Sequence, residues 1–219
     1  AEKTGEYRAR GNARATRDGV DVAADELVAF YRIGPGGESQ QIYRMDAIGN
    51  VVITSGQTEA VGDKAVYHLD QRVVVLVGRK LKLISPQATI TARESLEYWD
   101  EKEIAVARGK ATVIQQDIRL QAGVLTAFIR PDKKTGKKEV KRIDATSGVH
   151  VSTASEIVRG REGVYDIDSQ VAQLCGDVKI TRGDNQLNGE CATVNMKTGR
   201  SDLQGGGGKK VKGLILPAQ

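Results

Sequence analysis

The chain has 219 residues, of which 39% are hydrophobic and only 4% are aromatic, while glycine contributes 25 residues. So much glycine and so few aromatic rings argue against a compact helical protein and favour a thin, repetitive β structure of one or two domains. The net charge is +5, and the sequence has no run of 18 apolar residues that could form a membrane-spanning helix.

Alternating strands recur along the chain, each introduced by a glycine and followed by a polar turn. The alternation predicts strands with one apolar face, which in one of them carries Val51 and Ile53. A second strand and a third apolar segment, such as RVVVLVG at 72–78, then close the unit. Six such units predict many short strands and no helix. They start with GNARA at 11, GNVVI at 49, GRKLKL at 78, GKATV at 109, GVHV at 148 and GDVKI at 176.

A tandem duplication underlies these units. Residues 9–78 align with residues 107–176 without a gap, and 20 of the 70 aligned positions are identical. The sequence therefore predicts two halves, 1–106 and 107–219, each of three units, with a C-terminal strand added to the second. Because one unit cannot bury its apolar strip alone, we expect the halves to form one continuous stack.

Stacked units share an interior lined by aliphatic and small residues. This predicts an all-β protein, either an elongated β solenoid or a twisted β jelly roll of antiparallel strands. An interior with so few rings is either a narrow dry core, as in a purely structural protein, or a groove left open for an apolar guest. Composition does not decide between these two.

The sequence shows no catalytic or metal-binding motif. His68 aligns with an aspartate and His150 with a valine, so neither histidine belongs to a repeated site. Asp46 and Asp144 do repeat, as do Asp70 and Asp168, but they stand beside turn residues, where aspartate commonly accepts hydrogen bonds from the local backbone. A polysaccharide-cleaving β-helix enzyme is an alternative that requires carboxylates clustered on one strand face. We therefore expect no enzyme, no cofactor and no metal site.

Basic residues crowd into PDKKTGKKEVKR at 131–142. This segment is either an anion- or nucleic-acid-binding patch or a solvated turn between strands. Few aromatic residues lie nearby to stack on bases, so nucleic acid is not an expected partner. The basic residues are Lys133, Lys134, Lys137, Lys138, Lys141 and Arg142.

The two cysteines, Cys175 and Cys191, flank a predicted hairpin whose turn centres on Gly183 and Asp184. Strands that pair around this turn would bring the two sulfur atoms nearly opposite each other. In an oxidising compartment they would form a cross-strand disulfide, and otherwise they are two unpaired thiols.

The C-terminal segment joins GGGG at 205–208 to the apolar strand KKVKGLILPAQ at 209–219. The glycines predict a hinge or a bulge before that strand. As an edge strand, it would offer free backbone donors and acceptors to another copy of the chain.

Two stretches, GNVVITSGQTEAVGDKAVYHLDQRVVVLVG and GDVKITRGDNQLNGECATVNMKTGRSDLQG, resemble the repeated phrase of the OstA/LptA family. In that pattern a G-N/D-V-x-I strand leads into an apolar-x-Tyr strand and closes on an apolar-x-Gly. The stretch VAADELVAFYRIGPGGESQQ at 22–41 and the ending KKVKGLILPAQ are also similar to the family.

The resemblance implies a twisted β jelly roll with an open apolar groove, located in the periplasm of a Gram-negative bacterium. Members of the family carry lipopolysaccharide, shield the acyl chains of its lipid A in the groove, and serve outer-membrane biogenesis. They stack head to tail through strand edges, between an inner-membrane transporter complex and an outer-membrane translocon. An alternative with the same repeat is the periplasmic N-terminal domain of that translocon. The groove residues implied for this chain are Val51, Ile53, Tyr67, Leu69, Leu76, Val151, Tyr165, Ile167, Leu174, Val178 and Ile180.

Overall fold

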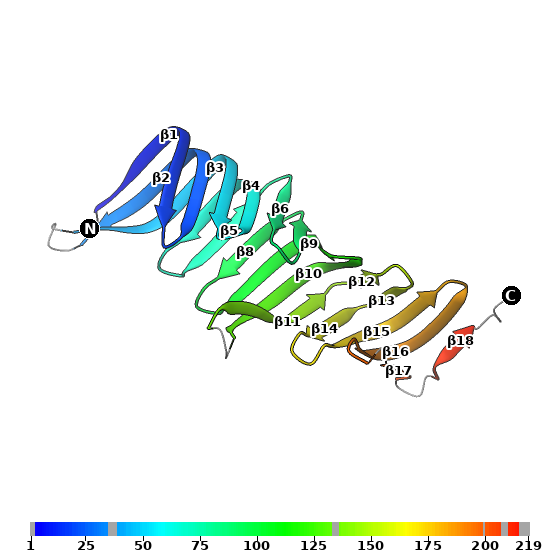
Figure 1. Cartoon of the computed structure of the whole chain (residues 1–219). Helices are drawn as coiled ribbons and strands as arrows, with labels where there is room; N and C mark the ends of the chain where they lie inside the picture. The colour runs from blue at the N-terminus through cyan, green and yellow to red at the C-terminus, as the bar shows by residue number, and fades with distance from the viewer. Residues whose placement is uncertain (1–2, 35–38, 133–135, 199, 207–209, 215–219) are drawn as a thin grey trace. The chain divides into compact units, whose positions relative to one another are not determined.

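The computed structural model describes residues 3–34, 39–132, 136–198, 200–206 and 210–214 (Figure 1). Every regular element in these ranges is a β-strand, and the strands pair antiparallel. The predicted all-β class is therefore confirmed. None of the described residues forms a helix that could cross a membrane.

The chain divides into two compact units, Ala1–Ala107 and Arg108–Gln219. In unit 1, β1 to β4 pair in sequence, and β4 then pairs with both β5 and β6. Strand β9 (Ile104–Gln115) crosses the border. The other strands of unit 1 are β1 (Lys3–Arg17), β2 (Val20–Ile33), β3 (Gln40–Ser55), β4 (Thr58–His68), β5 (Val73–Val77), β6 (Leu81–Ile84), β7 (Thr89–Ala92) and β8 (Ser95–Trp99).

Unit 2 repeats this plan. A long strand, β10, pairs with both β11 and β12, and the long hairpin β15–β16 is followed by β17 and β18, which both pair with β16. The strands of unit 2 are β10 (Ile118–Pro131), β11 (Lys138–Thr146), β12 (Val149–Ser152), β13 (Ile157–Gly160), β14 (Glu162–Asp166), β15 (Val171–Arg182), β16 (Asn185–Asn195), β17 (Arg200–Gln204) and β18 (Lys212–Leu214).

Two consecutive left-handed residues bend the long strands β1, β3, β9 and β15 at a corner. Within β3, Gly49 and Asn50 have φ angles of 77° and 47°, and the register with β4 shifts between Ile48 and Val51. Glycine adopts such a φ without steric cost, and asparagine tolerates it better than most residues. The residue pairs at the equivalent corners are Gly11–Asn12, Gly109–Lys110, Ser147–Gly148 and Gly176–Asp177.

The corners correct one prediction from the sequence. The glycines at 11, 49, 109 and 176 do not start strands but lie inside β1, β3, β9 and β15. The bulge bends the strand while its hydrogen-bond ladder resumes on the far side, so one strand supplies two arms, one before the corner and one after it. Near Gly78, Gly148 and Gly160 the strand breaks at the corner.

Leucine side chains pack against glycines at the corners and connect the two arms. In unit 1 an added Cβ on Gly62 would stand 2.8 Å from Leu76 Cδ1, and in unit 2 an added Cβ on Gly160 would stand 2.7 Å from Leu174 Cγ. Val51, Leu76 and Val178 are the largest fully buried side chains. Part of the core of each unit therefore lies at the corners.

Cys175 and Cys191 are directly opposite each other in the β15–β16 pair and form a disulfide, with their Cα atoms 4.1 Å apart. The hairpin turns at Gly183 and Asp184, between the paired residues Arg182 and Asn185. The bond therefore joins two strands that the hairpin has already placed side by side.

Several predicted features lie partly outside the described residues. They are Lys133 and Lys134 of the basic segment, 207–208 of the GGGG stretch, and residues 209 and 215–219 of the C-terminal segment.

We predict that Gly62→Ala lowers the free energy of unfolding by about 1–3 kcal/mol, because the new methyl group overlaps Leu76. Leu76→Ala alone should cost about 2–5 kcal/mol through the cavity it leaves. In the double variant the added methyl group partly fills that cavity. Urea denaturation of all four proteins should therefore give a double variant less destabilised than the sum of the single changes. Strict additivity would show that the Gly62–Leu76 contact does not connect the arms.

Candidate functional site

We call the part of each sheet that precedes the corner in β1, β3 or β15 the first arm, and the part beyond the corner the second arm. One face of the first arm of unit 1 is apolar across all its strands. Residues directly opposite each other in antiparallel strands share a face, so the register connects side chains into rows that run across the sheet. A corner row contains Ala9, Leu27, Ala47, Ala65, Leu76 and Leu96. A second row, farther from the corner, contains Tyr7, Ala29, Met45, Tyr67, Val74 and Tyr98.

The second arm of unit 1 also has an apolar row at a distance from the corner. It contains Ala15, Val22, Ile53, Ala60, Leu83 and Ile90. Gly62, which is paired with Val51 on this same face, is the residue against which Leu76 of the first arm packs. The apolar faces of the two arms therefore meet at the corner.

Burial decreases along these faces with distance from the corner. Ala47, Ala65 and Leu76 are 4%, 6% and 2% exposed, and Val51 is 1% exposed. By contrast, the row of Ile53 is half-buried throughout, and Tyr7 in the row of Tyr67 is 53% exposed. The apolar face of each arm is thus buried near the corner and accessible to solvent farther from it.

Unit 2 has the same arrangement, as the duplication requires. The row that matches Tyr67 contains Ala127, Ile143, Tyr165, Ala172 and Val194. The row that matches Ile53 contains Leu120, Val151, Val158, Ile180 and Leu187, all of them half-buried.

The structure distributes the predicted groove residues over three environments. Five lie in the accessible rows: Ile53, Tyr67, Val151, Tyr165 and Ile180. Four are packed at the corners, with exposures of 9% or less: Val51, Leu76, Leu174 and Val178. Leu69 and Ile167 lie in turns just after β4 and β14, where their N–H groups donate to the carbonyls of Tyr43 and Lys141.

The apolar rows include residues that sequence reasoning missed. Met45, Ala60 and Tyr98 in unit 1, and Val158 and Leu187 in unit 2, lie in the same rows as the predicted residues. Alternation along each strand was a usable signal for them. The missing information was the register, which decides which residues of neighbouring strands stand opposite each other.

The opposite face of the first arm of unit 1 mixes charged and apolar residues, and Asp46 stands between Val28 and Val66 on it. In unit 1, Arg44 Nε and Nη2 donate to the two carboxylate oxygens of Asp46 at 2.6 and 2.7 Å, and Lys64 Nζ lies 3.4 Å from Oδ2. The Asp46 side chain is 6% exposed. Burial by itself raises the pKa of Asp46, but the hydrogen bonds from Arg44 and the charges of Arg44 and Lys64 outweigh it and hold that pKa below its ordinary value.

The repeated aspartates were expected to accept hydrogen bonds from the local backbone, and the structure corrects this. Asp144 accepts from Arg142 Nε at 2.6 Å, as Asp46 accepts from Arg44. Asp70 accepts from Arg32, and Asp168 accepts from Lys141. A guanidinium matches a carboxylate with two parallel donors, so it out-competes single backbone N–H groups as a partner.

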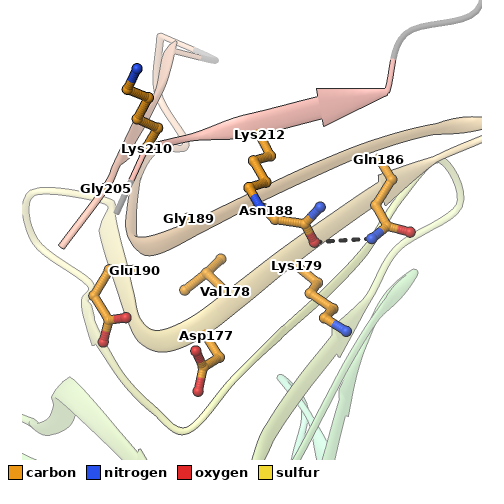
Figure 2. A pocket seen from close by; sticks show the side chains of 10 residues that line it. All are labelled: Asp177, Val178, Lys179, Gln186, Asn188, Gly189, Glu190, Gly205, Lys210 and Lys212. Carbon is orange, nitrogen blue, oxygen red and sulfur yellow. Dashed lines mark hydrogen bonds between the residues drawn. The ribbon is translucent and has the colours of Figure 1, made fainter. Parts of the chain in front are cut away.

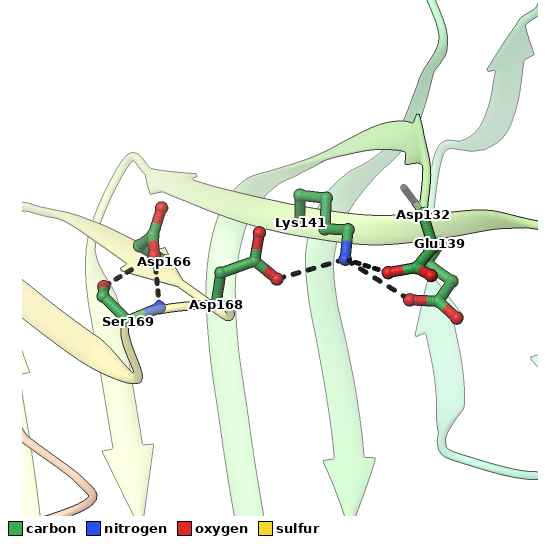
Figure 3. Close-up of polar contacts among 6 residues, drawn as sticks. All are labelled: Asp132, Glu139, Lys141, Asp166, Asp168 and Ser169. Atoms are coloured by element: carbon green, nitrogen blue, oxygen red, sulfur yellow. Dashed lines mark hydrogen bonds and ion pairs between the residues drawn. The ribbon is translucent and has the colours of Figure 1, made fainter. Parts of the chain in front are cut away.

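Lys141 in the basic segment is enclosed by carboxylates (Figure 3). Its Nζ lies 3.1 Å from Asp168 and 3.4 Å from both Asp132 and Glu139. Hydrogen bonding to Asp168 is the main reason that the pKa of Lys141 is raised. The described part of the segment is thus largely neutralised by its own neighbours, as expected of a turn between strands. No group of three or more His, Cys, Asp and Glu side chains among the described residues could hold a metal ion.

A model of the family described as LptA/(LptD N-terminal domain) LPS transport protein matches the chain twice, over residues 1–94 and 89–200. The chain belongs to this family. It is thus a lipopolysaccharide (LPS) transport protein, and the resemblance to OstA/LptA is confirmed. Two consecutive matches of the family model agree with the duplication seen in the sequence.

Two relatives extend this result. An uncharacterized protein of Rhizobium meliloti (strain 1021) is 28% identical over 133 residues, which are 59% of this chain and 72% of the relative. The crystal structure of LptH from Pseudomonas aeruginosa, the LptA homologous periplasmic component of the lipopolysaccharide transport device, aligns with a TM-score of 0.50 at 17% identity. The alignment covers 94% of LptH but only 58% of this chain, and it shows that the two share a fold.

We predict that Asp46→Asn lowers the free energy of unfolding by about 1–3 kcal/mol near neutral pH, because it weakens a buried charged hydrogen-bond pair. Asp144→Asn is the matched control. Its side chain is 26% exposed, and Glu162 stands where unit 1 has Lys64, so its loss should cost less than about 1 kcal/mol.

The effect of Asp46→Asn should also depend on pH. A lowered native pKa stabilises the fold above the unfolded-state value of about 3.9, and this contribution is lost as the pH falls through the native pKa. The difference in unfolding free energy between wild type and Asp46→Asn, measured by urea denaturation, should therefore shrink below about pH 4. A difference that stays constant down to acid denaturation would contradict the ion-pair explanation.

Proposed function

We propose that this chain is a periplasmic carrier that shields the acyl chains of lipid A on the apolar faces of its two units. The observation that carries the proposal is the pair of accessible apolar rows in each unit, the rows of Ile53 and Tyr67 and of Val151 and Tyr165. Apolar faces of this extent are normally covered in a soluble domain. In a family of LPS transport proteins, the covering group would be the lipid itself.

The physical chemistry of the rows suits a sliding lipid. Burial of each methylene group of an acyl chain is worth about 0.8 kcal/mol, so a chain lying along a row is held without any specific hydrogen bond. Successive positions across a row present similar aliphatic groups, such as Ile53, Ala60 and Leu83. The lipid could therefore shift from one strand to the next without a large barrier, and no covalent step is needed.

Location in the periplasm is supported by the family and by the disulfide. LptH is described as a periplasmic component of its transport device. The Cys175–Cys191 bond is of the kind that persists in oxidising compartments, among which is the bacterial periplasm.

We further propose that copies of the chain join end to end and bridge the inner-membrane transporter complex and the outer-membrane translocon. β1, with 15 residues, is paired within unit 1 only with β2 among the described residues. Such an edge offers backbone groups for strand addition. The family description also names the N-terminal domain of LptD, so that role is the second candidate.

Photocrosslinking at adjacent positions of one strand tests the lipid-binding faces. A photoreactive amino acid at Ile53 or Tyr165 should capture LPS, because both positions lie in accessible apolar rows. The matched controls are Thr54 and Val164, the neighbouring residues of the same strands, whose side chains point to the opposite face. Captured lipid would be detected by an LPS immunoblot and by mass spectrometry.

The comparison within each pair decides the outcome. Capture at Ile53 and Tyr165 that exceeds capture at Thr54 and Val164 by about tenfold supports burial of the lipid on the apolar faces. Equal capture at all four positions, or none at any of them, would overturn the carrier proposal.

A further inference from the structure

The second arm of unit 2 carries a row of basic residues on the face opposite its apolar row. The register places His150 opposite Arg159, Arg159 opposite Lys179, Lys179 opposite Asn188, and Asn188 opposite Lys212. We call Arg159, Lys179 and Lys212 the basic row. All three side chains are exposed.

The basic row has no carboxylate partners among the residues that the structure describes. None of its three cations makes a hydrogen bond or an ion pair with any other residue that the structure describes. Nearby acidic groups are engaged elsewhere, since Arg161 binds Glu190 at 3.1 Å and Arg182 binds Glu156 at 2.8 Å.

This arrangement disfavours folding. Like charges directly opposite each other across a sheet destabilise the strand pair, and Arg159 stands directly opposite Lys179. The corresponding row of unit 1 avoids the problem, because Val52 and Val61 occupy the positions of His150 and Arg159. A feature that opposes stability in only one of two duplicated units indicates a function of that unit.

The net charge is also distributed unevenly between the two units. Unit 2 has 19 Lys and Arg against 12 Asp and Glu, a net charge of +7, whereas unit 1 has 14 against 16, a net charge of −2. The positive charge of the chain thus belongs to unit 2. An anion approaching the chain is attracted to that unit.

A pocket of ≈ 760 Å³ lies at one end of the basic row (Figure 2). Lys179, Lys210 and Lys212 line it together with Asn188 and Gln186. The Gln186 amide donates to Asn188 Oδ1 at 2.9 Å, which holds the carboxamides in place. Asp177 and Glu190 also line the pocket, and Arg161 lies 4.0 Å from Asp177 and 3.1 Å from Glu190.

We propose that the basic row and its pocket bind phosphoryl groups. A phosphoryl group has several acceptor oxygens that point in different directions, and donors from separate strands can reach them together. Arg159 offers the planar fork that suits phosphate, and the lysines offer point charges. The row spans β13, β15, β16 and β18, about 14 Å at the usual strand spacing of about 4.8 Å, which is room for more than one phosphoryl group.

The source of the phosphoryl groups is inferred from the proposed function, on which this step rests. A transported lipid with a phosphorylated head group brings anionic groups to the same arm whose other face would cover its acyl chains. A soluble phosphate compound offers the same chemistry, and the experiment separates the two.

Binding is measured with bisphosphorylated lipid A, with the same lipid A after removal of both phosphates, and with inorganic pyrophosphate. The test variant is Arg159→Gln/Lys179→Gln. The matched control is Lys80→Gln/Lys82→Gln, which removes the same charge from exposed positions of unit 1. Circular dichroism and thermal unfolding of both variants check that they fold.

Wild type and the control should bind the phosphorylated lipid about tenfold more tightly than the dephosphorylated one, since charge-assisted hydrogen bonds contribute about 1.5–3 kcal/mol and 1.4 kcal/mol is a factor of ten. The test variant should lose this preference while it keeps its affinity for the dephosphorylated lipid. A preference that survives in the test variant, or that falls equally in the control, would overturn the proposal.

The experiment also distinguishes failure of the carrier proposal from failure of the phosphoryl site. If wild type binds neither lipid, the carrier proposal is wrong. The binding of pyrophosphate alone then tests whether the basic row binds phosphoryl groups. Pyrophosphate binding that is lost in the test variant then supports a soluble phosphate compound as the ligand. No pyrophosphate binding by wild type would in that case overturn the phosphoryl site.

Discussion

The bend at the corners is the constraint on which the rest of this structure depends. Two successive left-handed residues turn β1, β3, β9 and β15 without ending the strand, as Gly49 and Asn50 do in β3. Each strand therefore supplies two arms, and the apolar faces of the arms meet where Leu76 packs on Gly62. Straight strands with the same alternation would form a flat sheet whose apolar face is exposed to solvent over its full length. The bend makes the inner part of that face dry and leaves the outer part accessible.

Duplication then fixes what the two units share and shows what they do not. The corner glycines, the leucines that pack on them and the tyrosines of the accessible rows occur in both units, because each belongs to the repeated plan of the fold. Differences between the copies are informative for the same reason. Lys64 of unit 1 is replaced by Glu162, and Val61 is replaced by Arg159. The first change removes a cation from beside Asp144, and the second adds one to a row that already contains Lys179.

Alternation and the internal repeat were enough to predict the all-β class and to place Ile53 and Tyr67 in alternating strands. They were not enough to show how far each side chain is from a corner. Val51 and Ile53 share a strand and a face, yet one is 1% exposed and the other is half-buried. The corner lies inside the strand, at a bulge that the one-dimensional pattern marks only as a glycine followed by a polar residue. Leu69 illustrates the same limit, because the pattern continued past His68 where the strand ends.

The charged side chains were harder to predict than the apolar ones, and the reason is again the register. PDKKTGKKEVKR is the densest basic segment in the sequence, but Asp132, Glu139 and Asp168 satisfy its Lys141. Arg159, Lys179 and Lys212 are scattered over 54 positions and form no cluster in the sequence. The pairing of β13, β15, β16 and β18 gathers them on one face. Local charge density in the sequence therefore measures how many cations a turn contains, whereas free positive charge on the surface depends on which carboxylates the fold brings within reach. In an antiparallel β structure, where many neighbours across the sheet are distant along the chain, the second quantity determines where an anion can bind.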